Sequence, residues 1–120
     1  MEITLTADKY DEVVLGADGT VLIDFFATWC PPCRAIAPVI AEVAEEHPEI
    51  TVCKVNVDDE PALADRFAIK FVPTLAVLRH GKLLASVSTY MDKAGGSAVS
   101  AHIERQKGKL LFFSDMASAA

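Results

Sequence analysis

Residues 21–34 read VLIDFFATWCPPCR, and this segment carries the strongest structural signal of the sequence. The first seven residues are nearly all apolar, which is typical of a strand covered on both faces of a sheet. Apolar side chains then recur with helical spacing at Ile36, Val39, Ile40 and Val43. A strand is therefore predicted to lead directly into a helix, with Cys30 near the helix N-cap and Cys33 one turn further on.

Two cysteines at the start of a helix form a candidate redox pair. The first amide groups of a helix have no intrahelical acceptor and carry the positive end of the helix dipole, so they stabilise an anion such as a thiolate. We expect Cys30 to be the exposed nucleophile that attacks a disulfide. Cys33, further into the helix and less exposed, is expected to resolve the mixed disulfide formed at Cys30.

Zinc binding is one alternative for this pair, and an inert structural pair is another. Cys30 and Cys33 would supply half of a tetrahedral zinc site, and the other half needs two more ligands at suitable spacing. The remaining candidates are scattered singly along the chain, at His47, Cys53, His80 and His102. We therefore favour the redox interpretation and expect no metal.

Composition predicts one soluble domain. The chain has 120 residues, of which 52% are hydrophobic and 23% charged, enough for a single core. A net charge of -6 argues against nucleic acid and anionic membranes as partners, since both select basic surfaces.

We see no signal-peptide pattern and no apolar run near the roughly 20 residues that span a bilayer, so we expect a cytoplasmic protein. In such a reducing compartment a close cysteine pair favours catalysis or metal binding.

Strands and helices alternate along the rest of the chain. Further strands are predicted over residues 3–5, 51–57, 74–78 and 82–88, the last two joined by a hairpin turn at His80-Gly81. This order predicts βαβ crossovers and a mixed sheet with helices on both faces.

Three helices are expected between these strands, and a fourth after them. The first is brief, with Thr6 or Asp8 as its cap; the second runs from Cys30 to His47 with Pro38 inside it. The third is capped by Asp58 or Asp59. Residues 97–107 are predicted to be helical, although the apolar face there is thin, and residues 108–120 receive no assignment.

Residues 21–33 resemble the active-site segment of the thioredoxin family, and the likeness extends from Ile3 to about Lys93. The resemblance implies a thioredoxin-like three-layer α/β sandwich. We assign residues 1–107 to a thioredoxin domain and residues 108–120 to a C-terminal extension of uncertain structure. The expected function is reduction of protein disulfides by thiol-disulfide exchange. The alternatives are a disulfide oxidase or isomerase, or a binding module in which the redox pair is incidental.

The resemblance also implies partners. Disulfide-containing proteins would be the substrates, a thioredoxin reductase the electron donor, and no cofactor beyond the cysteine pair would be needed. We expect a monomer. Pro31 stands where the family commonly has glycine, and because proline has no N–H it removes one amide that could face the Cys30 sulfur.

Asp24 interrupts the apolar strand six residues before Cys30. A carboxyl in a dry strand interior has its pKa raised by desolvation, which makes Asp24 a candidate base for the Cys33 proton. Its position matches the buried acid of the family, and Lys54 matches the lysine beside that acid. The plainer alternatives are an acid at the solvent end of the strand and a lysine that only snorkels.

Residues 71–74, Phe-Val-Pro-Thr, resemble the family's cis-proline segment, which lies beside the cysteine pair. The backbone of Val72 is expected to pair with an extended substrate, and Pro73, which lacks an amide hydrogen, suits close approach to sulfur.

The remaining substrate contacts are predicted around the same groove. Trp29 is expected at its rim as a contact and a shield. Pro32, Thr89 and Tyr90 are assigned to the groove as well, the last two where the family tends to have glycine and a small residue. Cys53 is predicted to be a small buried hydrophobe.

Overall fold

The computed structural model of the chain describes residues 1–91 and 97–103. Its centre is a six-stranded sheet with the strand order β1-β3-β2-β4-β5-β6. The strands are β1 (Glu2–Thr4), β2 (Thr20–Phe26), β3 (Thr51–Asn56), β4 (Thr74–Arg79), β5 (Lys82–Met91) and β6 (Ser97–Ile103). β1 and β2 both run parallel to β3, whereas β4, β5 and β6 each run antiparallel to the strand before them in the sheet. The predicted mixed sheet is confirmed.

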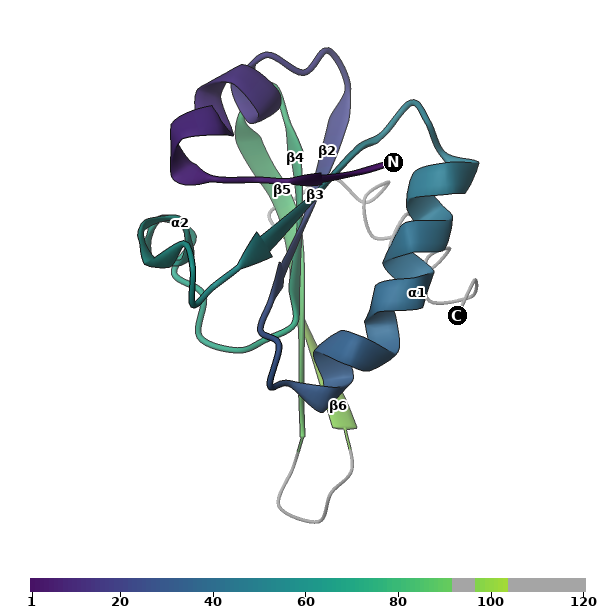
Figure 1. Cartoon of the computed structure of the whole chain (residues 1–120), viewed down its shortest axis with the longest axis vertical. Helices are drawn as coiled ribbons and strands as arrows, with labels where there is room; N and C mark the ends of the chain where they lie inside the picture. Colours follow the sequence, from purple (N-terminus) through teal and green to yellow (C-terminus); the bar gives the residue numbers. More distant parts are fainter. Residues whose placement is uncertain (92–96, 104–120) are drawn as a thin grey trace.

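Helices cover both faces of the sheet and complete three layers (Figure 1). α1 (Pro31–Glu46) lies on one face, while η1 (Ala7–Lys9), η2 (Asp11–Leu15) and α2 (Pro61–Arg66) lie on the other. The predicted three-layer α/β sandwich is confirmed. None of the helices in the described part of the chain is both long enough and apolar enough to cross a membrane.

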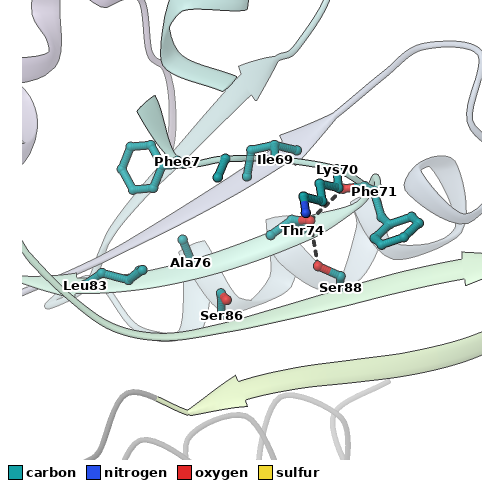
Figure 2. Close-up of a pocket in the computed structure, with 10 residues that line it drawn as sticks. Phe67, Ile69, Lys70, Phe71, Thr74, Ala76, Leu83, Ser86 and Ser88 are labelled. Carbon is teal, nitrogen blue, oxygen red and sulfur yellow. Dashed lines mark hydrogen bonds between the residues drawn. The ribbon is translucent and has the colours of Figure 1, made fainter. Parts of the chain in front are cut away.

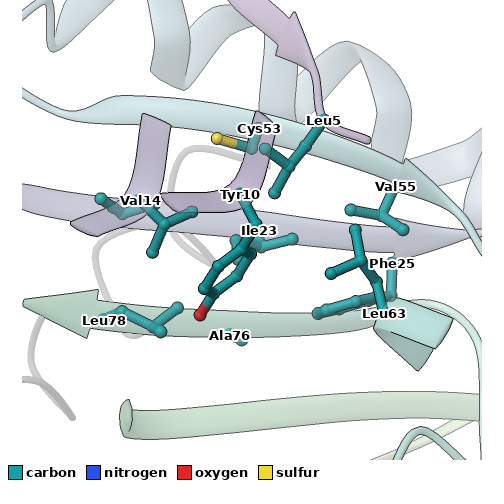
Figure 3. Close-up of a cluster of buried hydrophobic side chains, with 11 residues drawn as sticks. Leu5, Tyr10, Val14, Ile23, Phe25, Cys53, Val55, Leu63, Ala76 and Leu78 are labelled. Carbon is teal, nitrogen blue, oxygen red and sulfur yellow. The ribbon is translucent and has the colours of Figure 1, made fainter. Parts of the chain in front are cut away.

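Strand β2 contributes to the core on both of its faces, because successive side chains of a strand point in opposite directions. Val21, Ile23 and Phe25 pack into a cluster with side chains from η2 and α2 (Figure 3). Leu22 points the other way, into a cluster with Ile40 of α1. The unbroken apolar run of the sequence is therefore explained by a strand buried between two helical layers.

Two predictions about helix termini need correction. α2 begins after Glu60, whose side chain makes no cap and instead accepts a hydrogen bond from the Ala7 amide at 3.0 Å. Asp58 and Asp59 are therefore not its caps.

Thr6 does occupy the N-cap position of η1, but its hydroxyl donates to the Asp8 side chain and makes no hydrogen bond to the helix backbone.

The expected crossover through α2 is also wrong. β4 runs antiparallel to β2, so the connection from β3 through α2 to β4 is not a βαβ unit. The predicted turn at His80-Gly81 is confirmed, and both residues have positive φ, 51° and 76°, as the twist of a two-residue hairpin requires.

The helix predicted over residues 97–107 is wrong for the residues that the structure describes. Residues Ser97–Ile103 form β6, which pairs with β5 from Met91↔Ser97 to Ala85↔Ile103. A helix here would bury only a thin apolar face, whereas pairing with β5 provides partners for backbone groups along the strand. The extension at residues 108–120 and the domain boundary at residue 107 fall outside the described residues and stay predictions.

Ile40→Ala should destabilise the fold, because Ile40 is fully buried between α1 and the sheet. Removing this side chain leaves a cavity, with an expected loss of about 2–5 kcal/mol in the free energy of unfolding. Ile40→Val should lose about 0.5–1.5 kcal/mol by the same mechanism. Urea denaturation with the disulfide intact measures both changes.

Glu42→Ala is the matched control on the same helix. Glu42 is exposed, so this change should stay within about 0.5 kcal/mol of the unaltered protein. If Ile40→Ala cost no more than Glu42→Ala, α1 would not pack on the sheet as described.

Candidate active site

Cys30 and Cys33 are joined by a disulfide where β2 gives way to α1, with their Cα atoms 5.2 Å apart. Cys30 is the N-cap residue of α1, as predicted, and its sulfur accepts a hydrogen bond from the Cys33 amide at 3.2 Å. Pro31 and Pro32 occupy the first two helical positions and have no N–H. The amide of Cys33 is therefore the first that the helix can offer to a sulfur anion.

Arg34 ties the turn before the cysteine pair to the helix. Its guanidinium Nη1 donates to the carbonyl oxygen of Thr28 at 2.9 Å, and its backbone N–H donates to the carbonyl oxygen of Cys30 at 3.2 Å. These two bonds hold the segment from β2 to α1 from both ends. They thereby restrain the backbone that carries the Cys30 sulfur.

The expectation that Cys30 is more exposed than Cys33 is wrong for the disulfide form. Cys30 is 3% exposed and Cys33 4%, and both pack with Ala27, Phe26, Val57 and Val72. The disulfide draws the two sulfurs together, and side chains from β2 and the loop before β4 cover them. Both sequence neighbours of Cys30, Trp29 and Pro31, are exposed, so the sulfur lies just below the surface.

Val72 and Pro73 lie beside the pair, and the peptide bond between them is cis, as predicted. The carbonyl oxygen of Val72 is 3.5 Å from the Cys30 sulfur. Pro73 is buried and Val72 half-buried. The loop before β4 therefore forms one wall of the site, while pairing of Val72 with a substrate backbone stays a prediction.

Trp29 is 66% exposed, which places it at the rim as predicted. Its indole Nε1 donates to the carboxylate Oδ2 of Asp58 at 2.9 Å. The sequence interpretation missed this role of Asp58 by treating it as a helix cap. The available signal was that parallel strands end at the same edge of a sheet: Trp29 follows β2 by three residues and Asp58 follows β3 by two.

Asp24 is buried on the face of the sheet that α1 covers. It is 1% exposed and lies on the same face of β2 as Leu22 and Phe26, two residues before and after it, which pack on the α1 side. Neither carboxylate oxygen has a hydrogen-bond partner among the residues that the structure describes. Burial raises the pKa of Asp24 to about 6, against the nearby charge of Lys54, which lowers it, while Glu2 raises it further. A carboxyl that titrates near neutral pH can accept or release a proton there.

Lys54 lies beside Asp24 in the register of β3 and β2. Its Nζ is 3.9 Å from Oε1 of Glu2 and 4.7 Å from the centre of the Phe26 ring. The expected neighbour of the buried acid is therefore present, but its charged end is directed toward Glu2 on the edge strand. Glu2 is a second residue that the sequence interpretation missed.

The other predicted groove residues are less completely placed. Pro32 is half-buried in the first turn of α1. Thr89 and Tyr90 belong to β5, where their backbones pair with Val99 and Ala98. Their role as groove side chains stays a prediction.

Cys53 is fully buried in the cluster on the α2 side of the sheet, away from the redox pair. Burial raises the pKa of its thiol to about 12, so it stays protonated and unreactive near neutral pH. The predicted role as a small buried hydrophobe is confirmed. Within residues 1–91 and 97–103, no three His, Cys, Asp or Glu side chains come together as a group that could hold a metal ion.

A pocket of about 120 Å³ opens on the face of β4 that Ala76 shares with the α2-side cluster (Figure 2). Its floor comes from Ala76 and Leu83, and one wall is the segment after α2 that leads to Phe71. The Thr74 hydroxyl donates to the Phe71 carbonyl oxygen at 2.6 Å and shares a hydrogen bond with the Ser88 hydroxyl at 2.9 Å. Neither cysteine of the pair lines this pocket, so it is separate from the redox site.

The fold and the site together define a class of protein, the thiol-disulfide oxidoreductases that use their own cysteine pair. Comparison with known protein families identifies one family within this class. The Thioredoxin family profile matches residues 1–105. The chain belongs to the thioredoxin family.

Curated relatives agree with this assignment. The chain is 43% identical over 88 residues to "Thioredoxin M5, chloroplastic" of Oryza sativa subsp. japonica, a match that covers 72% of this chain and 51% of the rice protein. It is 38% identical over 108 residues to "Thioredoxin M-type, chloroplastic" of Zea mays, covering 81% of this chain and 65% of the maize protein. The chain thus spans about half to two thirds of the length of these plant relatives. It is 40% identical over 92 residues to the thioredoxin of Alicyclobacillus acidocaldarius, covering 76% of this chain and 87% of that one.

A solved structure shows the same fold. The X-ray structure of Fasciola hepatica thioredoxin superposes with a TM-score of 0.69 at 34% sequence identity, covering 73% of this chain and 86% of that chain.

Asp24→Asn should change how stability depends on pH. The pKa of Asp24 is raised from 3.8 to about 6 in the folded protein, so between these values the folded state holds a proton that the unfolded chain has released. The stabilisation is therefore complete below about pH 4 and is lost as the pH rises through about 6. Relative to the asparagine variant, the unfolding free energy of the unaltered protein should fall by on the order of 2–3 kcal/mol between about pH 4 and pH 7.

Parallel urea denaturations of the two proteins at stepped pH, with the disulfide intact, measure this difference. If the two stability curves stayed parallel over the whole range, Asp24 would titrate as an ordinary exposed aspartate.

Proposed function

We propose that this protein reduces disulfides of other proteins by thiol-disulfide exchange through Cys30 and Cys33. The observation that carries the proposal is the pair itself: a disulfide at a helix N-terminus, with the Cys33 amide donating to the Cys30 sulfur. In the reduced form the same donor would stabilise a Cys30 thiolate.

The exchange proceeds in two displacements at sulfur. The Cys30 thiolate attacks one sulfur of the substrate disulfide, forms a mixed disulfide, and releases the other substrate sulfur as a thiolate, which takes up a proton. Cys33 then loses its proton and attacks the Cys30 sulfur. This step forms the Cys30–Cys33 disulfide and releases the second substrate thiol. Two electrons pass from the protein dithiol to the substrate.

Asp24 is proposed to accept the Cys33 proton in the second step. Its support is a buried carboxyl on the α1 face of the sheet, with a pKa of about 6 and no hydrogen bond within the described residues to occupy it. Lys54 is proposed to assist by moderating the charge of the ionised carboxylate, because the two residues are in register on neighbouring strands.

Substrate is proposed to bind across the exposed rim of the site. Val72 and Pro73 would receive an extended segment, since the Val72 carbonyl oxygen lies 3.5 Å from the Cys30 sulfur and Pro73 follows it in the chain. Trp29 and Pro32 would contact it from the helix side. Thr89 and Tyr90 are proposed to line the far side of the same groove.

The electron donor is proposed to be a thioredoxin reductase, and no cofactor beyond the cysteine pair is proposed. We also propose a monomer in the cytoplasm, as expected from the sequence. The names of two relatives describe chloroplastic proteins, so fractionation of the host cell is the direct measurement of location.

Cys30→Ser should reduce insulin-disulfide turnover to the rate of the chemical reductant alone, because the attacking sulfur is gone. Cys33→Ser should retain the first displacement and accumulate a mixed disulfide, visible as an added mass that a reductant removes. Cys53→Ala is the matched control: its thiol is buried away from the site, so turnover should be unchanged. Turnover that survived Cys30→Ser would contradict the proposal.

The reduction potential of the Cys30–Cys33 pair decides the direction of exchange. Equilibrium against glutathione buffers should give a value more negative than about -220 mV, as expected for a protein that reduces disulfides in a glutathione-buffered cytosol. A value between about -180 and -120 mV is typical of disulfide isomerases and oxidases and would contradict the reductase assignment.

A further inference from the structure

Glu2 is a partly buried carboxylate that the proposed exchange does not use. It lies on edge strand β1 in register with Val52 of β3, two residues before Lys54. Lys54 is in register with Asp24 of β2. Residues paired across strands, and residues two apart along a strand, project to the same face of a sheet. Glu2, Lys54 and Asp24 therefore form a charged row across three neighbouring strands, on the face that carries Leu22 and α1.

Lys54 is the centre of this row but contacts only one of its carboxylates. Its Nζ is 3.9 Å from Glu2 Oε1, an oxygen that is itself buried and has no hydrogen-bond partner among the described residues. The ammonium also lies 4.7 Å from the centre of the Phe26 ring. Both carboxylate oxygens of Asp24 are buried as well, and neither has a hydrogen-bond partner among the described residues.

We propose that Glu2 is a positioning residue: its carboxylate draws the Lys54 ammonium toward the β1 edge and away from direct contact with Asp24, while the Phe26 ring of β2 lies beneath the cation. The geometry makes this a competition, because one cation lies between two anions and pairs with the one on the edge strand. By holding Lys54 away, Glu2 would keep the pKa of Asp24 high enough for it to take the Cys33 proton, and this consequence for exchange rests on the proposed role of Asp24 as proton acceptor.

Among the residues that the structure describes, no further charged group acts on Asp24 besides Lys54 and Glu2. From β4, its register partner is the uncharged Leu75. From α1, the buried side chains are Cys33, Ile40, Val43 and Ala44, and the Cys33 sulfur is held in the disulfide. Lys54 from β3 and Glu2 from β1 are thus the charges that act on the carboxyl, and they act in opposite directions: Lys54 lowers the pKa of Asp24 and Glu2 raises it.

Neutralising Glu2 should therefore act twice in the same direction. It removes a negative charge from the neighbourhood of Asp24, and it frees Lys54 to approach the Asp24 carboxylate. Glu2→Gln keeps the size of the side chain, and since Glu2 is on an edge strand with a partly exposed side chain, the fold should be retained.

The test is the titration of the Asp24 carboxyl by ¹³C NMR in the full chain, with the signal assigned by its loss in Asp24→Asn. Keeping the protein in the disulfide form prevents Cys30 and Cys33 from titrating. Glu2→Gln should lower the Asp24 midpoint by on the order of one pH unit. In the background of Lys54→Met, the same change should produce less than about half of that shift, because the cation that it would free is absent.

Glu12→Gln is the matched control, since it makes the same change of charge at an exposed residue of η2, on the opposite face of the sheet. If Glu2→Gln moved the Asp24 midpoint no more than Glu12→Gln, the proposal would be overturned. A shift of equal size with and without Lys54 would also overturn it, because Glu2 would then act by direct repulsion. Neither result depends on turnover, so failure of this inference is distinct from failure of the proposed function, which the cysteine variants report.

Discussion

The hydrogen bond from the Cys33 amide to the Cys30 sulfur exists because a buried strand ends and a helix begins within four residues. β2 is the third of six strands in the sheet order and is paired on both sides, so its end is held in place by β3 and β4. α1 is held in turn by Ile40 and its neighbours against the sheet. The sulfur therefore meets the helix amide without a conformational change, since both are carried by rigid elements.

Asp24 shows what this arrangement costs in stability. A carboxyl buried without a hydrogen bond in the described structure is unfavourable when ionised, and burial is the largest cause of its raised pKa. An apolar side chain at this position in β2 would pack on α1 without the penalty. Retaining an acid there is consistent with a role in proton transfer, and the row through Lys54 to Glu2 shows that the electrostatics of the site extend to the edge of the sheet.

Sequence reasoning was most successful where one local pattern left few alternatives. The apolar run of β2 and the helical spacing after Cys30 predicted the centre of the fold, because burial on two faces requires an unbroken apolar strand. It failed where neighbours distant in sequence decide the outcome. Residues 97–103 have a weak helical pattern, and pairing with β5 makes them a strand instead. Asp58 looks like a helix cap, but the end of β2 brings Trp29 to it.

The amino-acid order alone places two cysteines at a strand-to-helix junction with an acid in the strand before them, since strand and helix periodicities are local properties of the chain. The exposure of those sulfurs and the charges around the acid follow from long-range packing and could not be read from the local pattern. Burial of Cys30 depends on the loop at Val72, and the position of the Lys54 ammonium depends on Glu2, 52 residues away in the sequence. Contacts of this kind are set by strand order and register, which are not encoded in any single segment.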